Sequence, residues 1–428
     1  MVLSGGLAVE SADLAIVAAF VIGYALVSGR LSRTVFTGPM VFVAFGLLVG
    51  SAGLDVVDLS LENTLVEAIA EITLVIVLFS DAARIDLRIL SRNAAVPARL
   101  LGIGMPLTIA GGLVAAVVLF DGLSVWEAAL VAAVLAPTDA ALGQAVVTSA
   151  RVPVRIRQAL NVESGLNDGI AVPFVSIFIA GAAAAGGLGT AGFWTEFVAK
   201  QIGFGLLVGA GVGVASGLLI QYATATRWMN HTFQQLAILA VPLLAFAVAE
   251  QVGGNGFIAA FVAGIAIGNV TRRVGNRLFE FVEEEGQLLV LLTFMIFGGA
   301  FVGPALGDLT WQIALYAVLS LTVVRMVPVA ISMIGMRFQV DTVAFLGWFG
   351  PRGLASIVFG LLVLESSVDE RGAIFIIVTW TVLLSVVVHG LSARPSVDWY
   401  GAKAEMMADE PDMPEMEAVE EMPTRGMA

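Results

Sequence analysis

The stretch VLAPTDAALG, residues 134–143, places a proline and an aspartate in the middle of a long apolar run. Proline removes a backbone donor and clashes with the preceding helical turn, so a helix should break near Pro137. A second run, GWFGPRGLAS (347–356), sets Pro351 and Arg352 between glycines. In an apolar setting, freed backbone groups need partners from protein or water. Each break therefore predicts a cavity or a site.

The composition places these breaks in a membrane protein. The chain has 428 residues, of which 59% are hydrophobic and only 13% are charged, about half of the charged share in soluble domains. Apolar runs recur along the whole length, and each is long enough to cross a hydrocarbon core of about 30 Å. A transmembrane barrel would instead show alternating strands of about ten residues. We therefore predict an all-α polytopic membrane protein.

Hydropathy predicts thirteen transmembrane helices. Their approximate ranges are 13–28, 34–50, 63–80, 97–120, 125–150, 156–181, 196–222, 233–251, 254–270, 286–303, 311–336, 341–364 and 371–392. The proline breaks fall in the fifth and twelfth, which we expect to be discontinuous. These two helices are an odd number of helices apart and so cross the membrane in opposite directions, as in two inverted six-helix repeats joined by the seventh helix. The alternative is that both prolines are ordinary kinks.

Charge outside the helices predicts the orientation. The odd-numbered connections hold 14 of the 21 Lys and Arg residues, whereas the even-numbered connections hold mostly acids. The positive-inside rule then places the N-terminus outside and the C-terminus in the cytoplasm. The first helix is not preceded by a basic region and does not resemble a signal peptide. We expect a multi-pass protein of the cell membrane.

The last segment, 396–428, differs from residues 1–395, which would form the membrane domain. It holds nine acids and two bases, a net charge of −7, out of −13 for the whole chain. Such an acidic stretch is expected to be disordered and to aid solubility. A regulatory role is the alternative, for which charge alone offers no physical argument.

Five charged residues fall near the middle of predicted helices: Asp139, Glu163, Asp168, Arg325 and Arg352. One charge at the bilayer centre costs about 2.5–3.5 kcal/mol on insertion scales, so they should face one another or a wet cavity. Only two bases are available for three acids. A purely structural role is therefore least favoured for Asp139 and Asp168. Arg325 is the natural partner for Glu163, and Arg352 either pairs with an acid or neutralises the ends of the broken helix.

The stretch NVESGLNDGIAVPF (161–174) carries polar residues at helical spacing. Glu163 and Asn167 are four residues apart and share one face of a helix. Ser164 and Asp168 share the neighbouring face. We expect the Ser164–Asp168 face to point at a ligand and the other face to hold helices together.

Thr138 and Asp139, at the break of the fifth helix, can complete an oxygen shell with Ser164 and Asp168. They offer a hydroxyl, a freed carbonyl and a carboxylate. An all-oxygen shell of modest charge suits a hard monovalent cation. A carboxylate in a partly dry site can also take up a proton near neutral pH, so the cation and the proton can compete for the same oxygens.

These motifs together resemble the sodium/proton exchanger type of cation:proton antiporters, in its NhaP-like branch. APTDAAL resembles the family's broken-helix motif, and NVESGLNDGIA its Asn-Asp ion-site motif. VVRMVPV carries the matching arginine, Arg325, and GPRGLASI resembles the second broken helix. NGFIAAFVAGIAIGN (255–269) is similar to the family's ninth helix. The resemblance covers about residues 10–395.

The resemblance implies a homodimer in which a core domain, helices 4–6 and 11–13, moves like an elevator against a dimerisation domain, helices 1–3 and 8–10. It makes Asp168 the main Na⁺- and H⁺-binding carboxylate, with Asp139, Thr138 and Ser164 completing the shell. Glu163 and Arg325 would hold the core. Asn167 stands where the electrogenic branch has aspartate, which implies electroneutral exchange. PTD departs from many relatives in the residue before the aspartate, and could tune ion choice.

The expected function is therefore antiport of Na⁺, and of Li⁺, against H⁺ in pH homeostasis. K⁺/H⁺ antiport on the same fold is the alternative, and a channel or a solute symporter is less favoured. The chain has no cysteine and only two distant histidines, which argues against thiolate chemistry and a His-based metal site. We expect no enzyme activity, no cofactor and no nucleic-acid partner, because no nucleophile–base pair or cofactor loop is present.

Overall fold

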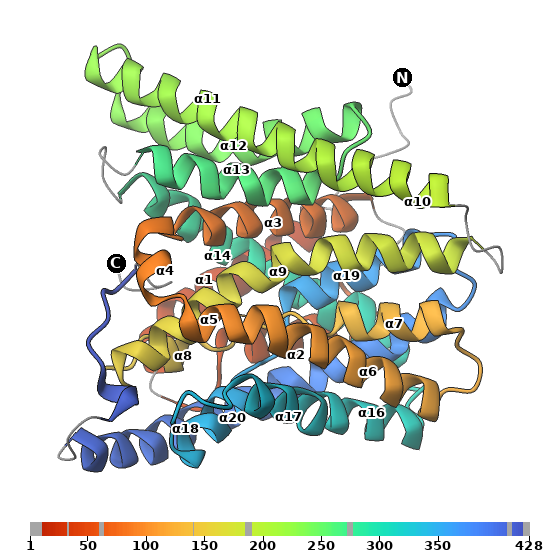
Figure 1. Ribbon diagram of the computed structural model, residues 1–428. Helices are drawn as coiled ribbons and strands as arrows, with labels where there is room; N and C mark the ends of the chain where they lie inside the picture. The colour runs from red at the N-terminus through yellow and green to blue at the C-terminus, as the bar shows by residue number, and fades with distance from the viewer. Residues whose placement is uncertain are drawn as a thin grey trace, which may run out of the picture.

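The computed structural model describes residues 11–31, 34–59, 64–139, 141–184, 191–271, 277–408 and 413–422. Within these ranges the chain is helical and contains no strand. The long helices run roughly side by side across the molecule (Figure 1).

The described residues up to 184 form ten helical segments: α1 (Ser11–Leu31), α2 (Gly38–Val49), α3 (Thr64–Ala83), α4 (Leu87–Asn93), α5 (Ala95–Arg99), η1 (Leu100–Gly104), α6 (Met105–Leu119), α7 (Val125–Val134), α8 (Gln144–Val147) and α9 (Val154–Ala183). The rest forms α10 (Ala191–Val198), η2 (Ala199–Phe204), α11 (Gly205–Ala225), α12 (His231–Gln251), α13 (Gly256–Thr271), α14 (Arg277–Ile296), η4 (Phe297–Val302), α15 (Gly303–Ala305), α16 (Trp311–Leu321), α17 (Val323–Ser332), α18 (Val340–Trp348), α19 (Leu354–Glu365), α20 (Arg371–Ala408) and η5 (Pro414–Met416).

Every predicted span coincides with helical segments, and both predicted breaks are present. Within the part of the chain that the structure describes, eight helices are long and apolar enough to cross a membrane, and four shorter apolar helices accompany them. The fifth span is α7 and α8 with non-helical backbone between them, and the twelfth is α18 and α19 with residues 349–353 unwound. The full count of thirteen transmembrane helices stays a prediction.

Proline alone does not decide where a helix breaks. Pro173 in α9, Pro242 in α12 and Pro395 in α20 all lie inside continuous helices. The eleventh span, in contrast, is interrupted at Thr322, which carries φ −112° and ψ −93° between α16 and α17. The sequence did not predict this interruption, because no proline or glycine stands at that position.

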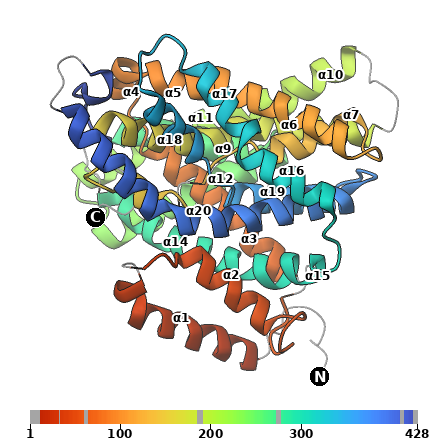
Figure 2. The same ribbon diagram turned by 90° about the horizontal axis from the view of Figure 1, so that it is seen from below.

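The helices pack in two groups. The α13 group contains α2, α3 and α11–α14, with α13 in contact with α3, α11 and α12. The α9 group contains α5–α9 and α16–α20, in which α7 packs on α6 and α9, and α20 packs on α16 and α19. Figure 1 shows α11, α12 and α13 along one side and α16, α17 and α20 along the other, and Figure 2 shows α1 and α2 at the edge of the molecule. The groups meet where α3 and α13 contact α9.

Small residues allow the helices of the α13 group to approach closely. A Cβ atom on Gly213 of α11 would lie 2.6 Å from the carbonyl oxygen of Ala263 in α13. On its other side, α13 presents Gly268 to the carbonyl oxygen of Ala83 in α3. Helices in lipid associate through such close packing, because the hydrophobic effect offers little drive between them.

The C-terminal segment, 396–428, was predicted to be disordered. Where the structure describes this segment, it does not agree with that prediction. Residues 396–408 continue α20 as a helix. Residues 413–422, which we call the tail anchor, pack against the protein, and Glu415 and Met422 are buried within it. The acids of the segment meet arginines of the membrane domain, a pairing that its composition alone does not reveal. Residues 409–412 and 423–428 lie outside the described ranges.

We predict that Gly268→Ala destabilises the protein. Its added methyl group overlaps the backbone of α3, and such overpacking costs about 1–3 kcal/mol. Thermal unfolding in detergent measures the effect. Gly211→Ala is the matched control, because a Cβ atom on Gly211 meets nothing within 4 Å. An equal loss of stability in both variants would contradict the packing argument.

Candidate functional site

The two interrupted helices meet backbone to backbone. The amide nitrogen of Asp139 donates to the carbonyl oxygen of Pro351 over 2.7 Å. The amide of Leu354, at the start of α19, donates to Oδ2 of Asp139 over 2.8 Å. The two unwound segments, predicted separately near Pro137 and Pro351, therefore lie against each other in the α9 group. We call the place where they cross the crossing.

Asp139 satisfies several of the backbone donors at this crossing. Its Oδ1 accepts from the amide of Ala141 at 2.6 Å and from that of Leu142 at 3.4 Å. The carboxylate is 8% exposed and faces amides from both halves of the fold. The sequence predicted a cation ligand here, which stays a prediction. The capping of two unwound segments is a role that the sequence did not reveal.

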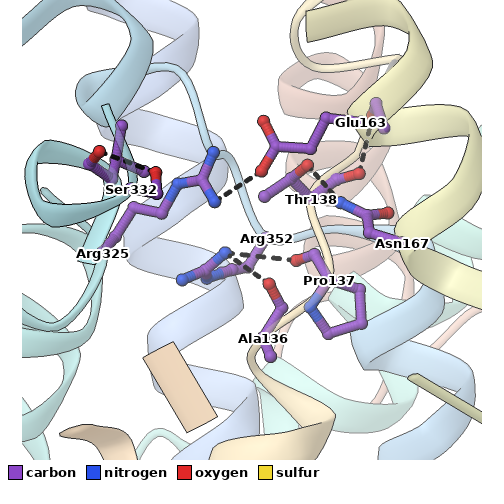
Figure 3. Close-up of polar contacts among 10 residues, drawn as sticks. Ala136, Pro137, Thr138, Glu163, Asn167, Arg325, Ser332 and Arg352 are labelled. Atoms are coloured by element: carbon purple, nitrogen blue, oxygen red, sulfur yellow. Dashed lines mark hydrogen bonds and ion pairs between the residues drawn. The ribbon is translucent and has the colours of Figure 1, made fainter. Parts of the chain in front are cut away.

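Arg352 satisfies carbonyl groups at the same crossing. Its guanidinium is fully buried, and Nη1 donates to the carbonyl oxygens of Ala136 and Pro137 over 3.0 and 3.3 Å (Figure 3). Of the two alternatives left open by the sequence, the structure places Arg352 against the end of the broken helix. A positive charge is favourable there because the carbonyl end of a helix is partly negative.

Glu163 and Arg325 form a buried ion pair beside the crossing. Glu163 Oε1 lies 2.6 Å from Arg325 Nη1, and each side chain is 2% exposed (Figure 3). The pair joins α9 to α17, and so joins the two sequence halves of the α9 group. The structure brings together the two residues that the sequence paired.

Both polar faces of α9 contact Thr138, one through Ser164 and the other through Asn167. Ser164 donates its hydroxyl to the carbonyl oxygen of Thr138 over 2.7 Å. Asn167 donates from Nδ2 to the Thr138 hydroxyl over 2.5 Å (Figure 3). The sequence assigned these residues to separate ligand-facing and structural faces, whereas both faces reach the same unwound segment.

A small cavity lies beside these oxygens. It measures about 20 Å³, close to the room for one water-sized sphere. Its walls include Thr138, Asp139 and Ser164, which are three of the four predicted ligands. Asp168 lies one helical turn further along α9, is 8% exposed and is not part of these walls. The site thus gathers carboxylate, hydroxyl and carbonyl oxygens, the donor set of a hard cation.

The sequence model of the transmembrane sodium/hydrogen exchanger family matches residues 16–399. The chain belongs to this family. It is a family of transmembrane transporters, which agrees with the expectation that the chain is not an enzyme.

Relatives and a solved structure agree with this membership. The chain is 28% identical to the K(+)/H(+) antiporter NhaP of Alkalimonas amylolytica, over 87% of this chain and 64% of that protein. It is 29% identical to the Na(+)/H(+) antiporter ApNhaP of Aphanothece halophytica, over 83% and 69%. The chain therefore spans only about two thirds of these relatives. The fold is similar to that of the sodium proton antiporter MjNhaP1 from Methanocaldococcus jannaschii, with a TM-score of 0.72 and 20% identity over 93% of this chain and 99% of that chain.

A large cavity approaches the small cavity beside Thr138 and Asp139. It measures about 770 Å³ and lies between the two helix groups, with walls from α1, α2, α14, α20 and the segment 141–149. Leu142 on its wall directly precedes Gly143, which lines the small cavity. Arg394 and Asp398 of α20 lie among its lining residues. The cavity therefore reaches the unwound segment that follows Asp139.

Among the buried acids that the sequence analysis did not single out, one lies on α3 beside α9. Asp81 of α3 is 8% exposed and approaches α9 at Gly165, next to Ser164. Its Oδ1 lies 3.9 Å from Nη2 of Arg84, which also pairs with Glu283 at 3.0 Å. The signal in the sequence was an acid close to the apolar run of the third span. The predicted span ended at residue 80, so Asp81 was expected to lie in the following loop.

We predict that Glu163→Leu and Arg325→Met each destabilise the protein strongly. Each leaves one buried charge without its partner, which costs about 3–5 kcal/mol. The double variant removes both charges and should be more stable than either single variant. Thermal unfolding of all four proteins in detergent measures this. Additive losses in the double variant would contradict a direct pairing.

Proposed function

We propose that this chain exchanges a monovalent cation, Na⁺ or Li⁺, for H⁺ across the cell membrane. The observation that carries the proposal is the crossing of α7–α8 with α18–α19, beside which buried oxygens of Thr138, Asp139 and Ser164 line one cavity. Membership of the sodium/hydrogen exchanger family and the names of its relatives support it. Transport of this kind serves pH homeostasis.

Asp168 is the proposed main carboxylate. It stands one turn from Ser164, whose hydroxyl and partner carbonyl at Thr138 already converge. A cation bound there would be neutralised by the Asp168 carboxylate, and a proton would replace that cation on the same oxygens. Asp139 would add a second acidic oxygen once its contacts to the backbone amides rearrange.

Alternating access would come from movement of the α9 group against the α13 group, as in an elevator. The ion site lies within the α9 group, and the cavity of about 770 Å³ lies between the groups. We place the end that carries Arg394 and Asp398 in the cytoplasm, so that this cavity is the inner route to the site. The α13 group, together with α1, would form the contact between two copies in a homodimer.

Exchange is proposed to be electroneutral. The position before Asp168 is Asn167, whose amide cannot titrate and is held by the Thr138 hydroxyl. Asp168 would then be the carboxylate that exchanges its proton, with Asp139 held by backbone amides, so that one monovalent cation would replace one proton.

K⁺/H⁺ exchange is the second candidate. It is favoured by the relative from Alkalimonas amylolytica and by another from Shewanella oneidensis, 25% identical, both named K(+)/H(+) antiporters. The small cavity of about 20 Å³ does not fix the size of the ion it accepts. Proton flux measured with Na⁺, Li⁺ and K⁺ in turn separates the two candidates.

We predict that Asp168→Asn abolishes exchange, because the amide can neither release a proton nor neutralise the cation. Protein in liposomes with a trapped pH dye should then show no cation-dependent pH change beyond that of empty liposomes. Asp121→Asn is the matched control, since this acid lies exposed in the turn before α7. Full exchange by the Asp168 variant would contradict the mechanism.

A second prediction concerns voltage. Moving one net charge through about 100 mV corresponds to about 2.3 kcal/mol, so an electrogenic exchanger should respond strongly to a clamped potential. We expect the exchange rate of this chain to stay nearly constant when a potassium gradient with valinomycin sets the potential. This measurement uses Na⁺ as the exchanged ion. A strong dependence of the rate on potential would show that net charge moves.

A further inference from the structure

The unwound segment between α18 and α19, residues 349–353, forms part of the wall of the small cavity. Phe349 and Pro351 line this cavity together with three of the four predicted ion ligands. The segment also sets the position of Asp139, whose amide donates to the Pro351 carbonyl oxygen over 2.7 Å and whose Oδ2 accepts from the Leu354 amide at 2.8 Å. A shift of the segment would therefore move both the cavity wall and the carboxylate beside it.

The composition of this segment does little to fix its shape. Gly350 and Gly353 belong to the residue type with the widest choice of backbone angles. Pro351, between them, has no amide hydrogen to donate. Gly353 is the N-cap of α19 and makes no side-chain cap. The polar groups at the two ends of the segment must therefore be bound by other elements.

His389 of α20 binds the end of α18. Its imidazole is 1% exposed, and Nε2 lies 3.0 Å from the carbonyl oxygen of Trp348, the last residue of α18. The imidazole also packs on the indole of Trp348, with 5.2 Å between the ring centroids. Because a carbonyl oxygen only accepts, Nε2 carries a hydrogen and donates it. The same oxygen accepts from the Gly350 amide at 2.9 Å, so both of its acceptor positions are used.

Ser385, one turn earlier on α20, binds the other end of the segment. Its hydroxyl oxygen accepts from the Arg352 amide at 2.6 Å and lies 3.2 Å from Nδ1 of His389. An imidazole with its hydrogen on Nε2 has a lone pair on Nδ1, to which the Ser385 hydroxyl can donate. The Ser385 carbonyl oxygen lies 3.1 Å from the same nitrogen, but an Nδ1 without a hydrogen has nothing to donate to it. His389 therefore orients the hydroxyl that holds Arg352.

We propose that His389 is a positioning residue of the ion site, which acts on Asp139 through the segment 349–353. The inference rests on the proposed antiport. His389 and Ser385 hold the two ends of the segment against one helix, so that the Pro351 carbonyl stays at the Asp139 amide. Groups that orient the ligands of an ion commonly change its affinity when they are removed, because the ligand oxygens lose their fixed geometry.

Loss of the imidazole should weaken cation binding while exchange continues. In liposomes, His389→Ala should raise the KM for Na⁺ of the cation-dependent proton flux by about threefold to tenfold, the change expected for one or two hydrogen bonds. Ser385→Ala should raise this KM to a similar extent. His389→Gln should stay within about twofold of the wild type, because its amide nitrogen can still donate to the Trp348 carbonyl.

A purely structural role of His389 predicts a different result. A variant that only folds less well lowers the maximal rate, because fewer molecules are active, and leaves the KM of the remaining molecules unchanged. Thr379→Ala is the matched control, since this hydroxyl is also buried in α20 but donates to the Phe375 carbonyl of its own helix. An unchanged KM in His389→Ala and Ser385→Ala, or a KM in His389→Gln as high as in His389→Ala, would overturn the proposal.

A second measurement needs neither transport nor a destabilised variant. The chain has only two histidines, so nitrogen NMR of histidine-labelled protein in detergent gives few signals, and His231→Gln assigns them. We expect the imidazole of His389 to carry a hydrogen on Nε2 at neutral pH. A hydrogen on Nδ1 alone would break the bond to Trp348 and would overturn the proposed arrangement.

The two proposals fail in different ways. A wild-type chain without proton flux in Na⁺, Li⁺ or K⁺ would contradict the antiport itself. A wild-type chain that exchanges ions, combined with an unchanged KM in His389→Ala and Ser385→Ala, would contradict only the positioning role. If the wild-type chain exchanges K⁺ alone, the same KM comparison is made with K⁺.

Discussion

The α9 group depends on the need to satisfy unwound backbone inside an apolar interior. At the crossing, the Asp139 amide bonds the carbonyl of Pro351, and the Asp139 carboxylate accepts from Leu354. Arg352 satisfies the carbonyls of Ala136 and Pro137. Because an unpaired buried polar group costs free energy, each interrupted helix is stable only in the presence of the other. The same open backbone supplies oxygens to the candidate ion site.

The buried charges near the crossing have different partners. Arg325 is neutralised by Glu163, which joins α9 to α17, while Arg352 faces helix carbonyls instead of a carboxylate. Asp139 is held by the backbone amides of Ala141 and Leu354 at the same place. Buried carboxylate oxygens beside the small cavity suit a site that holds either a cation or a proton.

Much of the fold could be predicted because lipid restricts the chain to a few structures. Apolar run length predicted the helical segments, and the pairs Pro137–Asp139 and Pro351–Arg352 marked the two breaks. The continuous helices through Pro173 and Pro242 agree with the predicted spans. The interruption at Thr322 could not be predicted, because neighbouring helices decide whether a local preference prevails. The tail was misjudged for a related reason: composition predicts disorder only when a segment finds no complementary surface.

For the candidate site, the sequence by itself determined which residues are polar in an apolar environment and which of them share a helix face. Helical spacing is local, so the placement of Ser164 with Asp168 and of Glu163 with Asn167 followed from numbering alone. Only the tertiary structure decided that Arg352 faces helix carbonyls, that Asn167 bonds Thr138, and that Asp81 approaches Gly165. These are contacts between segments far apart in the chain, and their geometry is set by how whole helices pack.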